Sequence, residues 1–235
     1  MEIPKLHGTV GELAAQLKYV GEKIVQYYGE VYEDHAAGHL RRVAAASLIR
    51  VSDCLDAVAR LADAKLGLEA HTIVRTIVEL AITLCWVGLD ERRAQAIWDK
   101  SIDDITKGLG RAGKQAPVPK EISEFVARLR ASHGGTKRPT VQKMAEEALD
   151  IPELAGHKIA GVLYDYLFDP LSAASHGDLR FAKAILAGAE KEFVPSALEY
   201  AVAATEYLLI AASAQLGFRP DLEKFLQTIS RDQQS

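Results

Sequence analysis

Cysteine is scarce in this sequence, which has two among its 235 residues, as well as only two methionines and two tryptophans. Two cysteines cannot form a disulfide framework or a four-cysteine metal site. The sequence also lacks a His-Glu-x-x-His zinc motif, the Glu-x-x-His motif of di-iron bundles and a complete Gly-x-x-x-x-Gly-Lys-Ser/Thr phosphate loop. No strand that could carry a dinucleotide-binding fingerprint is predicted. We therefore expect neither a metal nor an organic cofactor.

Strand signals are also absent, because no segment alternates apolar and polar residues for long enough to predict a β-strand. Apolar residues instead recur at helical spacing almost throughout the chain. The predicted helices include residues 33–65, residues 68–88, a helix capped by Asp90, a short one within 107–143, another after Thr140, and residues 195–215. Gly67 is expected to cap the first of them. The predicted fold class is all-α, a single-domain helical bundle over residues 1–235.

Residues 68–89 form the most apolar segment and are nearly long enough to span a membrane. Three charged residues lie within it, and each charge at a bilayer centre costs about 2.5–3.5 kcal/mol. The N-terminal residues Met-Glu-Ile-Pro-Lys contain no secretory signal. We therefore expect a cytoplasmic protein without a membrane partner, in which this segment is the central buried helix.

Positive charge is concentrated in one segment, although the whole chain has a formal charge of −4. Residues 107–143 contain nine lysines and arginines and two glutamates, so their local charge is +7 and the other residues carry −11. Eight glycines and prolines predict that this insertion is loop-rich. Such a segment is typical of a surface that binds RNA or another polyanion, and we assign binding roles to Arg128, Arg130, Lys137 and Arg138. The alternative is a solvated surface without a partner.

Arg75 and Glu79 are charged residues in an otherwise apolar helix. They lie four positions apart, on one helix face. Burying a charge is costly unless it is paired and hydrogen-bonded, so we expect the two to pair. The guanidinium has five N–H donors, so further partners should converge there. Two interpretations remain open: a structural ion pair between helices, or the floor of a site in which Arg75 binds an anion.

Residues 164–178 contain the other candidate site residues, which are Tyr164, Tyr166, Ser172 and His176. The serine and the histidine lie four apart in a predicted helix, with small alanines between them that leave room for a ligand. A histidine near its ordinary pKa can act as a general acid or base. We expect His176 to share one pocket with Arg75 and Glu79. The alternative is a histidine that hydrogen-bonds a neighbouring helix.

Six further residues could carry chemistry: Cys54, Cys85, Trp86, Trp98, His35 and His39. The cysteines lie in apolar helices and are expected to be buried thiols. The tryptophans are expected to be core residues. The two histidines have the spacing of metal ligands on a helix, but no carboxylate is placed to complete a site.

The segment from Ala70 to Leu80 resembles the core of a bacterial family, the domain of unknown function 5677. That family shows Arg-x-x-x-Glu-Leu in a helix, which corresponds here to Arg75, Glu79 and Leu80. It then shows a tyrosine, a Leu-Ser pair and a histidine, which correspond to Tyr164 or Tyr166, Leu171-Ser172 and His176. The resemblance covers roughly residues 35–215.

The helical architecture of this family is similar to that of the HEPN group, many of whose members are metal-independent ribonucleases. The ribonuclease signature of the group is an arginine, a polar residue and a histidine four to six positions after the arginine. Arg128 and His133 have this spacing, although Leu129 stands in the polar place. The resemblance implies an RNA-binding or RNA-cleaving helical protein.

RNA cleavage is the enzymatic activity that best suits these residues, because the 2′-hydroxyl of RNA is its own nucleophile and no cofactor is needed. His176 would move protons and Arg75 would stabilise the developing charge, with Glu79 and Ser172 completing the catalytic set. The basic segment would hold the backbone. The alternative is a non-catalytic binding or protein-interaction module, in which the same residues fix helix packing. A homodimer is compatible with both the ribonuclease interpretation and the non-catalytic one.

Overall fold

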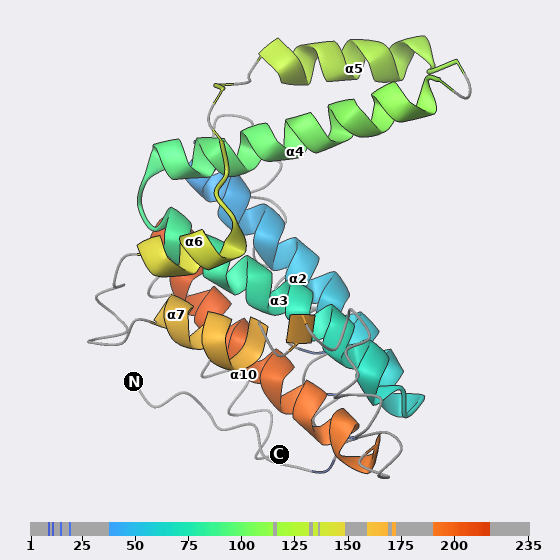
Figure 1. Ribbon diagram of the computed structural model, residues 1–235, viewed down its shortest axis with the longest axis vertical. Helices are drawn as coiled ribbons and strands as arrows, with labels where there is room; N and C mark the ends of the chain where they lie inside the picture. Colours follow the sequence, from blue (N-terminus) through green and yellow to red (C-terminus); the bar gives the residue numbers. More distant parts are fainter. Residues whose placement is uncertain are drawn as a thin grey trace.

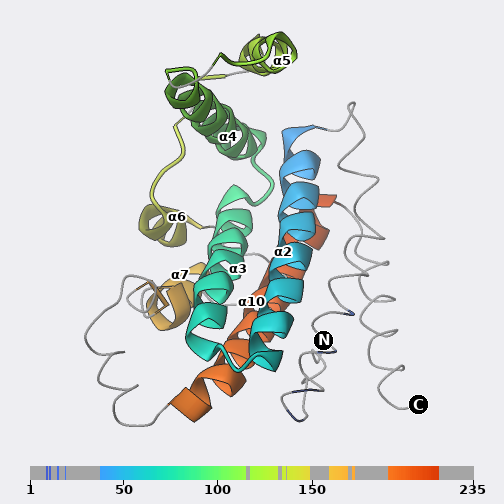
Figure 2. The ribbon, with the colours of Figure 1, turned by 90° about the vertical axis from the view of Figure 1, so that its right-hand side faces the viewer.

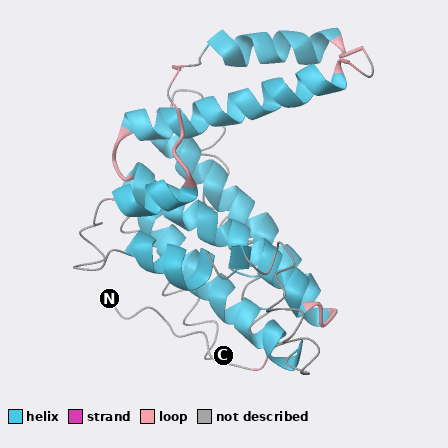
Figure 3. Ribbon diagram, in the orientation of Figure 1, coloured by secondary structure: helices cyan, strands magenta, loops and turns pink. Residues whose placement is uncertain are grey.

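The computed structural model describes residues 38–114, 117–131, 134–135, 137–148, 159–168, 171–172 and 190–216, together with Thr9, Gly11, Ala15 and Tyr19. In this part of the chain every regular element is a helix and there is no strand (Figure 3), so the all-α prediction is confirmed. The elements are α2 (His39–Asp63), α3 (Gly67–Val87), α4 (Glu91–Ala112), α5 (Lys120–Ala131), α6 (Val141–Glu147), α7 (Ile159–Leu163), the π-helix η2 (Tyr164–Phe168) and α10 (Glu190–Leu216).

The centre of the fold is formed by α2, α3 and α10, which pack against one another (Figures 1 and 2). Because α3 is apolar on nearly all sides, it must be covered on all sides, and α6, α7 and η2 cover the face that the other two long helices leave open. Cys54 and Cys85 are buried and unoxidised in this core, as predicted. Burial raises the pKa of both thiols, that of Cys85 to about 12.

Two helices are long and apolar enough to span a membrane: α3 over Gly67–Val87, and α10 over Glu192–Ala212. Core helices of soluble proteins meet the same criterion. Within the fold, 67 % of the first span and 50 % of the second are buried. About two thirds of the first span and half of the second are therefore already covered within the fold.

The first residues of α2 are capped by a side chain from α4. The Glu91 carboxylate accepts hydrogen bonds from the backbone N–H of His39 at 2.5 Å and of Leu40 at 3.3 Å. Gly38, directly before α2, has extended backbone angles. The predicted start at residue 33 is therefore wrong, because a carboxylate 52 positions away satisfies the free N–H groups of a helix that begins at His39.

The turn between α2 and α3 differs from the prediction. Lys65, not Gly67, adopts the left-handed backbone conformation, with φ of 60°. Gly67 is the first residue of α3, where α10 approaches closely: a Cβ at Gly67 would lie 2.6 Å from Phe193 Cβ and 2.7 Å from Val194 N. The glycine is therefore needed for helix contact and not as a cap.

The hairpin of α4 and α5 extends away from the three central helices (Figure 1). The Asp90 side chain caps α4 by accepting from Arg92 N at 2.8 Å, as predicted. Loops were predicted from residue 107 onward, but α4 continues through Gly108 and Gly110 to Ala112. Each glycine costs a helix about 1 kcal/mol, and the packing of α4 on α2 and α5 offsets this cost. The predicted amphipathic helix in this segment is α5, which buries Val126.

The chain returns from the hairpin to the bundle along α4. Asp99 is 1 % exposed, and its Oδ1 accepts from Gln95 Nε2 at 2.6 Å and from Gly134 N at 2.9 Å. The predicted helix after Thr140 is present as α6, and Thr140 Oγ1 caps it by accepting from Lys143 N. The acid on α4 therefore fixes the path of the linker that carries Arg138.

Candidate functional site

Arg75 and Glu79 each contact a residue far away in the sequence. The Arg75 guanidinium carbon lies 4.8 Å from the centroid of the Phe168 ring, in η2. Glu79 Oε1 accepts from Arg138 Nη2 at 2.8 Å. The expected ion pair between Arg75 and Glu79 is not found in the described part of the chain. Both residues are half-buried, so this face of α3 is more open than predicted.

Two buried donors at this site have no acceptor among the residues that the structure describes. The Nε atoms of Arg75 and Arg138 are inaccessible, and neither has a hydrogen-bond partner among the described residues. Leaving a buried donor unsatisfied costs about 1–3 kcal/mol. Glu79 neutralises only one of the two guanidinium groups, so the three side chains carry a net charge of +1. The arrangement suits an anion, which would accept from the unpartnered donors.

The aromatic side of the site belongs to η2, which continues from α7. Tyr164 stacks on Phe168 with ring centroids 5.5 Å apart and planes 24° apart. A π-helical turn is rare and often marks a functional site. It brings Tyr164 and Phe168, at i and i+4, to the same side as Arg75.

The other predicted site residues are placed only in part. Ser172 is half-buried, in the helical turn at 171–172 that follows η2, and it has an interaction partner. The backbone of Tyr166 lies in η2, but its side chain is outside the described part of the structure. His176 and His133 are also outside it. The structure thus joins Arg75 to Phe168, which stacks on Tyr164, and one turn further along α3 it joins Glu79 to Arg138. The shared pocket with His176 stays a prediction.

Basic side chains on the hairpin and its linker are largely unpaired. All nine basic residues of 107–143 except the half-buried Arg138 are exposed. Three of the nine are paired with a glutamate: Lys120 with Glu124, Arg138 with Glu79 and Lys143 with Glu147. In the described structure no carboxylate lies within 4 Å of the other six, which are Lys107, Arg111, Lys114, Arg128, Arg130 and Lys137. These six residues are called the basic surface below.

The glycines of this segment have the spacing of two phosphate-binding motifs but not the structure that either motif needs. Gly108, Gly110 and Gly113, followed by Lys114, have the spacing of both a dinucleotide fingerprint and a phosphate loop, although Gln115 stands where the loop needs Ser or Thr. Both motifs bind phosphate only in a turn between a strand and a helix. Here the first two glycines are inside α4, so the segment forms no such turn.

A buried histidine joins α3 to α10. His71 Nδ1 donates to Gly67 O at 2.7 Å, which leaves Nε2 as the acceptor facing Ser196 Oγ at 3.1 Å. The Phe193 and Tyr200 rings lie edge-on to the imidazole. Burial lowers the pKa of His71, so the ring is neutral near pH 7. The Ser196 hydroxyl can also donate to Glu192 O at 2.9 Å. The pair therefore stabilises the contact between the two helices.

Metal chemistry finds no support in the described residues. No three His, Cys, Asp or Glu side chains there lie close enough to hold an ion. His39, one of the two histidines with metal-ligand spacing, has Nδ1 3.1 Å from Glu91 Oε1 instead. The other, His35, lies outside the described residues.

Comparison with known proteins identifies the family. The model of DUF5677, a family of unknown function, matches residues 41–192. This chain belongs to DUF5677. No curated protein and no solved structure matches it. The DUF5677 match extends from the first turn of α2 into α10, and therefore includes the α4–α5 hairpin and the Arg75 site.

The Glu79–Arg138 pair gives a direct test of this geometry. The two side chains are 32 % and 22 % exposed, so replacing Glu79 with alanine should lower the free energy of unfolding by about 1–2 kcal/mol, less than the 3–5 kcal/mol of a fully buried pair. A double-mutant cycle with Arg138→Ala, measured by urea denaturation, should give a coupling energy near 1 kcal/mol. The exposed pair Lys120–Glu124 is the control and should couple by less than about 0.5 kcal/mol. Equal coupling in the two cycles would contradict the structure.

Proposed function

We propose that this DUF5677 protein binds single-stranded RNA through the basic surface, with the Arg75 site accepting one phosphate. The observation that carries the proposal is the set of six exposed basic side chains that have no carboxylate partner in the described part of the chain. Unpaired cations on a projecting hairpin repel one another, and the phosphates of a bound polyanion neutralise them. Binding also releases the counterions of the polyanion, which favours the complex.

The charges are arranged so that one strand can contact several of them. Lys107 and Arg111 lie one turn apart on α4, and with Lys114 they line one shallow depression on the protein surface. Asp104 is the acid in this depression. A hydrogen bond from Lys100 lowers the pKa of Asp104, so a lysine already neutralises that carboxylate. The depression is therefore positive on balance.

Arg138 connects the basic surface to the Arg75 site. It belongs to the linker that leaves α5, and its guanidinium reaches α3 at Glu79. A strand bound along the hairpin could place its next phosphate at the unpartnered Nε of Arg75. Binding through these residues needs no histidine. Cleavage, which would need His176, stays a prediction.

Salt dependence tests the proposal. Binding of a fluorescent oligouridine, followed by anisotropy, should weaken as salt rises, with a slope of log K against log salt of about −2 to −3.5 for three to five phosphate contacts. Changing Lys107, Arg111, Arg128 and Arg130 together to serine should reduce the slope by about 0.7 for each lost contact. Arg138 is left unchanged because it pairs with Glu79.

The matched control removes the same charge elsewhere. Arg41, Arg50, Arg60 and Lys65, on the exposed side and end of α2, are changed to serine together. This variant should keep the slope of the unmodified protein. No salt-dependent binding, or equal loss in both quadruple variants, would reject RNA binding and leave the protein-interaction module as the better interpretation.

A further inference from the structure

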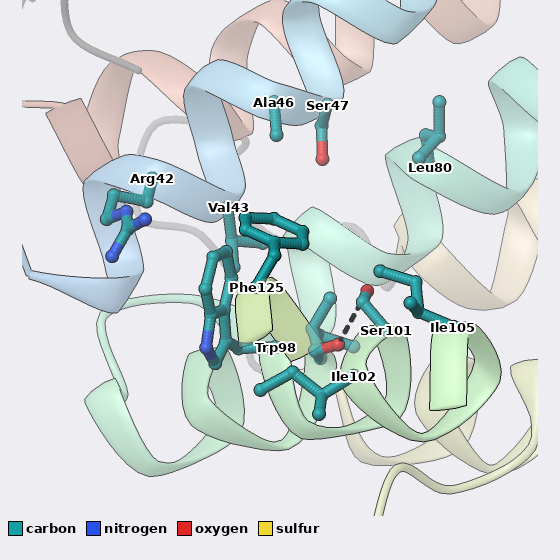
Figure 4. A pocket seen from close by; sticks show the side chains of 11 residues that line it. Arg42, Val43, Ala46, Ser47, Leu80, Trp98, Ser101, Ile102, Ile105 and Phe125 are labelled. Atoms are coloured by element: carbon teal, nitrogen blue, oxygen red, sulfur yellow. Dashed lines mark hydrogen bonds between the residues drawn. The ribbon is translucent and has the colours of Figure 1, made fainter. Parts of the chain in front are cut away.

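A cavity of about 330 Å³ lies where the α4–α5 hairpin meets α2 and α3. Figure 4 shows Arg42 and Trp98 at one end of it and Leu80 and Ile105 at the other. Trp98 was predicted to be a core residue, but it is half-buried and forms part of the cavity wall. The volume is at the lower end of the range for small-molecule sites. It is too small for a helix of a partner protein and fits one compact ligand.

The wall is apolar except near Arg42 and two serines. Val43, Ile102 and the half-exposed Phe125 supply aliphatic and aromatic surface from three different helices. Ser101 Oγ already donates to Ile97 O at 3.1 Å. Ser47 is 6 % exposed, and its hydroxyl points into the space between the helices (Figure 4). The cavity thus offers a mainly apolar body with few polar groups, as ligand sites do.

Arg42 gives the cavity its charge. Its guanidinium carbon lies 4.4 Å from the centroid of the Trp98 ring, which holds the side chain in place. Its Nε is buried and has no hydrogen-bond partner in the described part of the chain. The nearby acid, Glu91, is occupied by the N–H groups of His39 and Leu40 and by the His39 ring. Arg42 therefore has an unsatisfied donor beside an apolar cavity, and no carboxylate of the described residues is paired with it.

We propose that this cavity binds a small anionic amphiphile, with a single carboxylate or similar anionic head at Arg42 and an aliphatic or aromatic body between Trp98, Phe125 and Leu80. A cation would be repelled by Arg42. A neutral apolar molecule would leave the buried Nε unsatisfied, which is the costly arrangement. The site is separate from the Arg75 site, and it does not depend on RNA binding.

Decanoate is a suitable probe because it carries one carboxylate on an unbranched apolar chain. The full-length protein is titrated with decanoate below its micelle concentration, and binding is followed by calorimetry and by tryptophan emission. Trp98 lines the cavity, whereas the other tryptophan, Trp86, is buried in the core. We expect saturable binding at one site per chain with a change in emission. The uncharged analogue decanol should bind more weakly.

Three variants separate the contribution of the Arg42 charge to binding from that of the cavity volume. Arg42→Gln should weaken decanoate binding at least tenfold and leave decanol binding nearly unchanged. Arg41→Gln, which removes the same charge from the neighbouring exposed residue, should change neither. Ala46→Leu, which fills the cavity from α2, should weaken both ligands, and circular dichroism checks that each variant is folded.

The outcomes decide the proposal. One-site binding that Arg42→Gln and Ala46→Leu weaken, and Arg41→Gln does not, supports it. Should Arg42→Gln fail to fold, the loss of binding in Ala46→Leu decides instead. No saturable binding of decanoate to the unmodified protein, or equal binding by Ala46→Leu, overturns it.

Discussion

Replacing Gly67 with alanine should lower the free energy of unfolding by about 3 kcal/mol, which is a large effect for adding one methyl group. The new Cβ would lie 2.6 Å from Phe193 Cβ and 2.7 Å from the Phe193 carbonyl carbon and Val194 N. Two of these atoms are backbone atoms, so no side-chain rotation can relieve the clash. α3 and α10 would have to move apart, and this movement would break the His71–Ser196 hydrogen bond between them.

Gly108→Ala is the matched control for this prediction. Gly108 is also helical, in α4, and nothing lies within 4 Å of the position of an added Cβ. Alanine should therefore raise the free energy of unfolding by about 0.5–1 kcal/mol, because it loses less chain entropy on folding. Urea denaturation of both variants measures the difference. A Gly67→Ala protein as stable as the unmodified one would show that the two helices are not in this close contact.

The second large effect is expected at Asp99, the buried acid of α4. Asp99→Ala should lower the free energy of unfolding by about 2–4 kcal/mol, because it removes the two hydrogen bonds that the Asp99 carboxyl group accepts and leaves Gln95 Nε2 and Gly134 N without this acceptor. Asp99→Asn keeps one acceptor oxygen and should lower the free energy of unfolding by less than Asp99→Ala does. Both variants are measured by urea denaturation.

Amide exchange locates the effect of Asp99. Because Gly134 N donates to Asp99 Oδ1, its amide should exchange much faster in Asp99→Ala. Glu121→Ala, at an exposed acid of α5, should change the stability by less than about 0.5 kcal/mol. If Gly134 keeps its protection in Asp99→Ala, the linker is held by other contacts and the role assigned to this carboxylate is wrong.

The same linker explains why the candidate site was only partly predictable. Arg75 and Glu79 stood out because each is a charge in an apolar helix, and a charge there must be satisfied. Glu79 needed a cation, and the nearest one in the sequence was Arg75. The structure supplies Arg138 from 59 positions away instead. That residue was predicted, but as part of the polyanion-binding segment. No local pattern indicates which of nine basic side chains reaches α3.

Local physical chemistry was enough for the all-α class, for α3 and α5, for the cap at Asp90 and for the helix after Thr140. Helical periodicity and side-chain capping act within a few residues, so the sequence displays them directly. The contact at Gly67, the capping of α2 by Glu91, the Glu79–Arg138 pair and the cavity beside Trp98 required the tertiary structure. Each depends on the distance between two helices that are remote in the chain, and that distance is set by the packing of the whole core and not by the residues on either side.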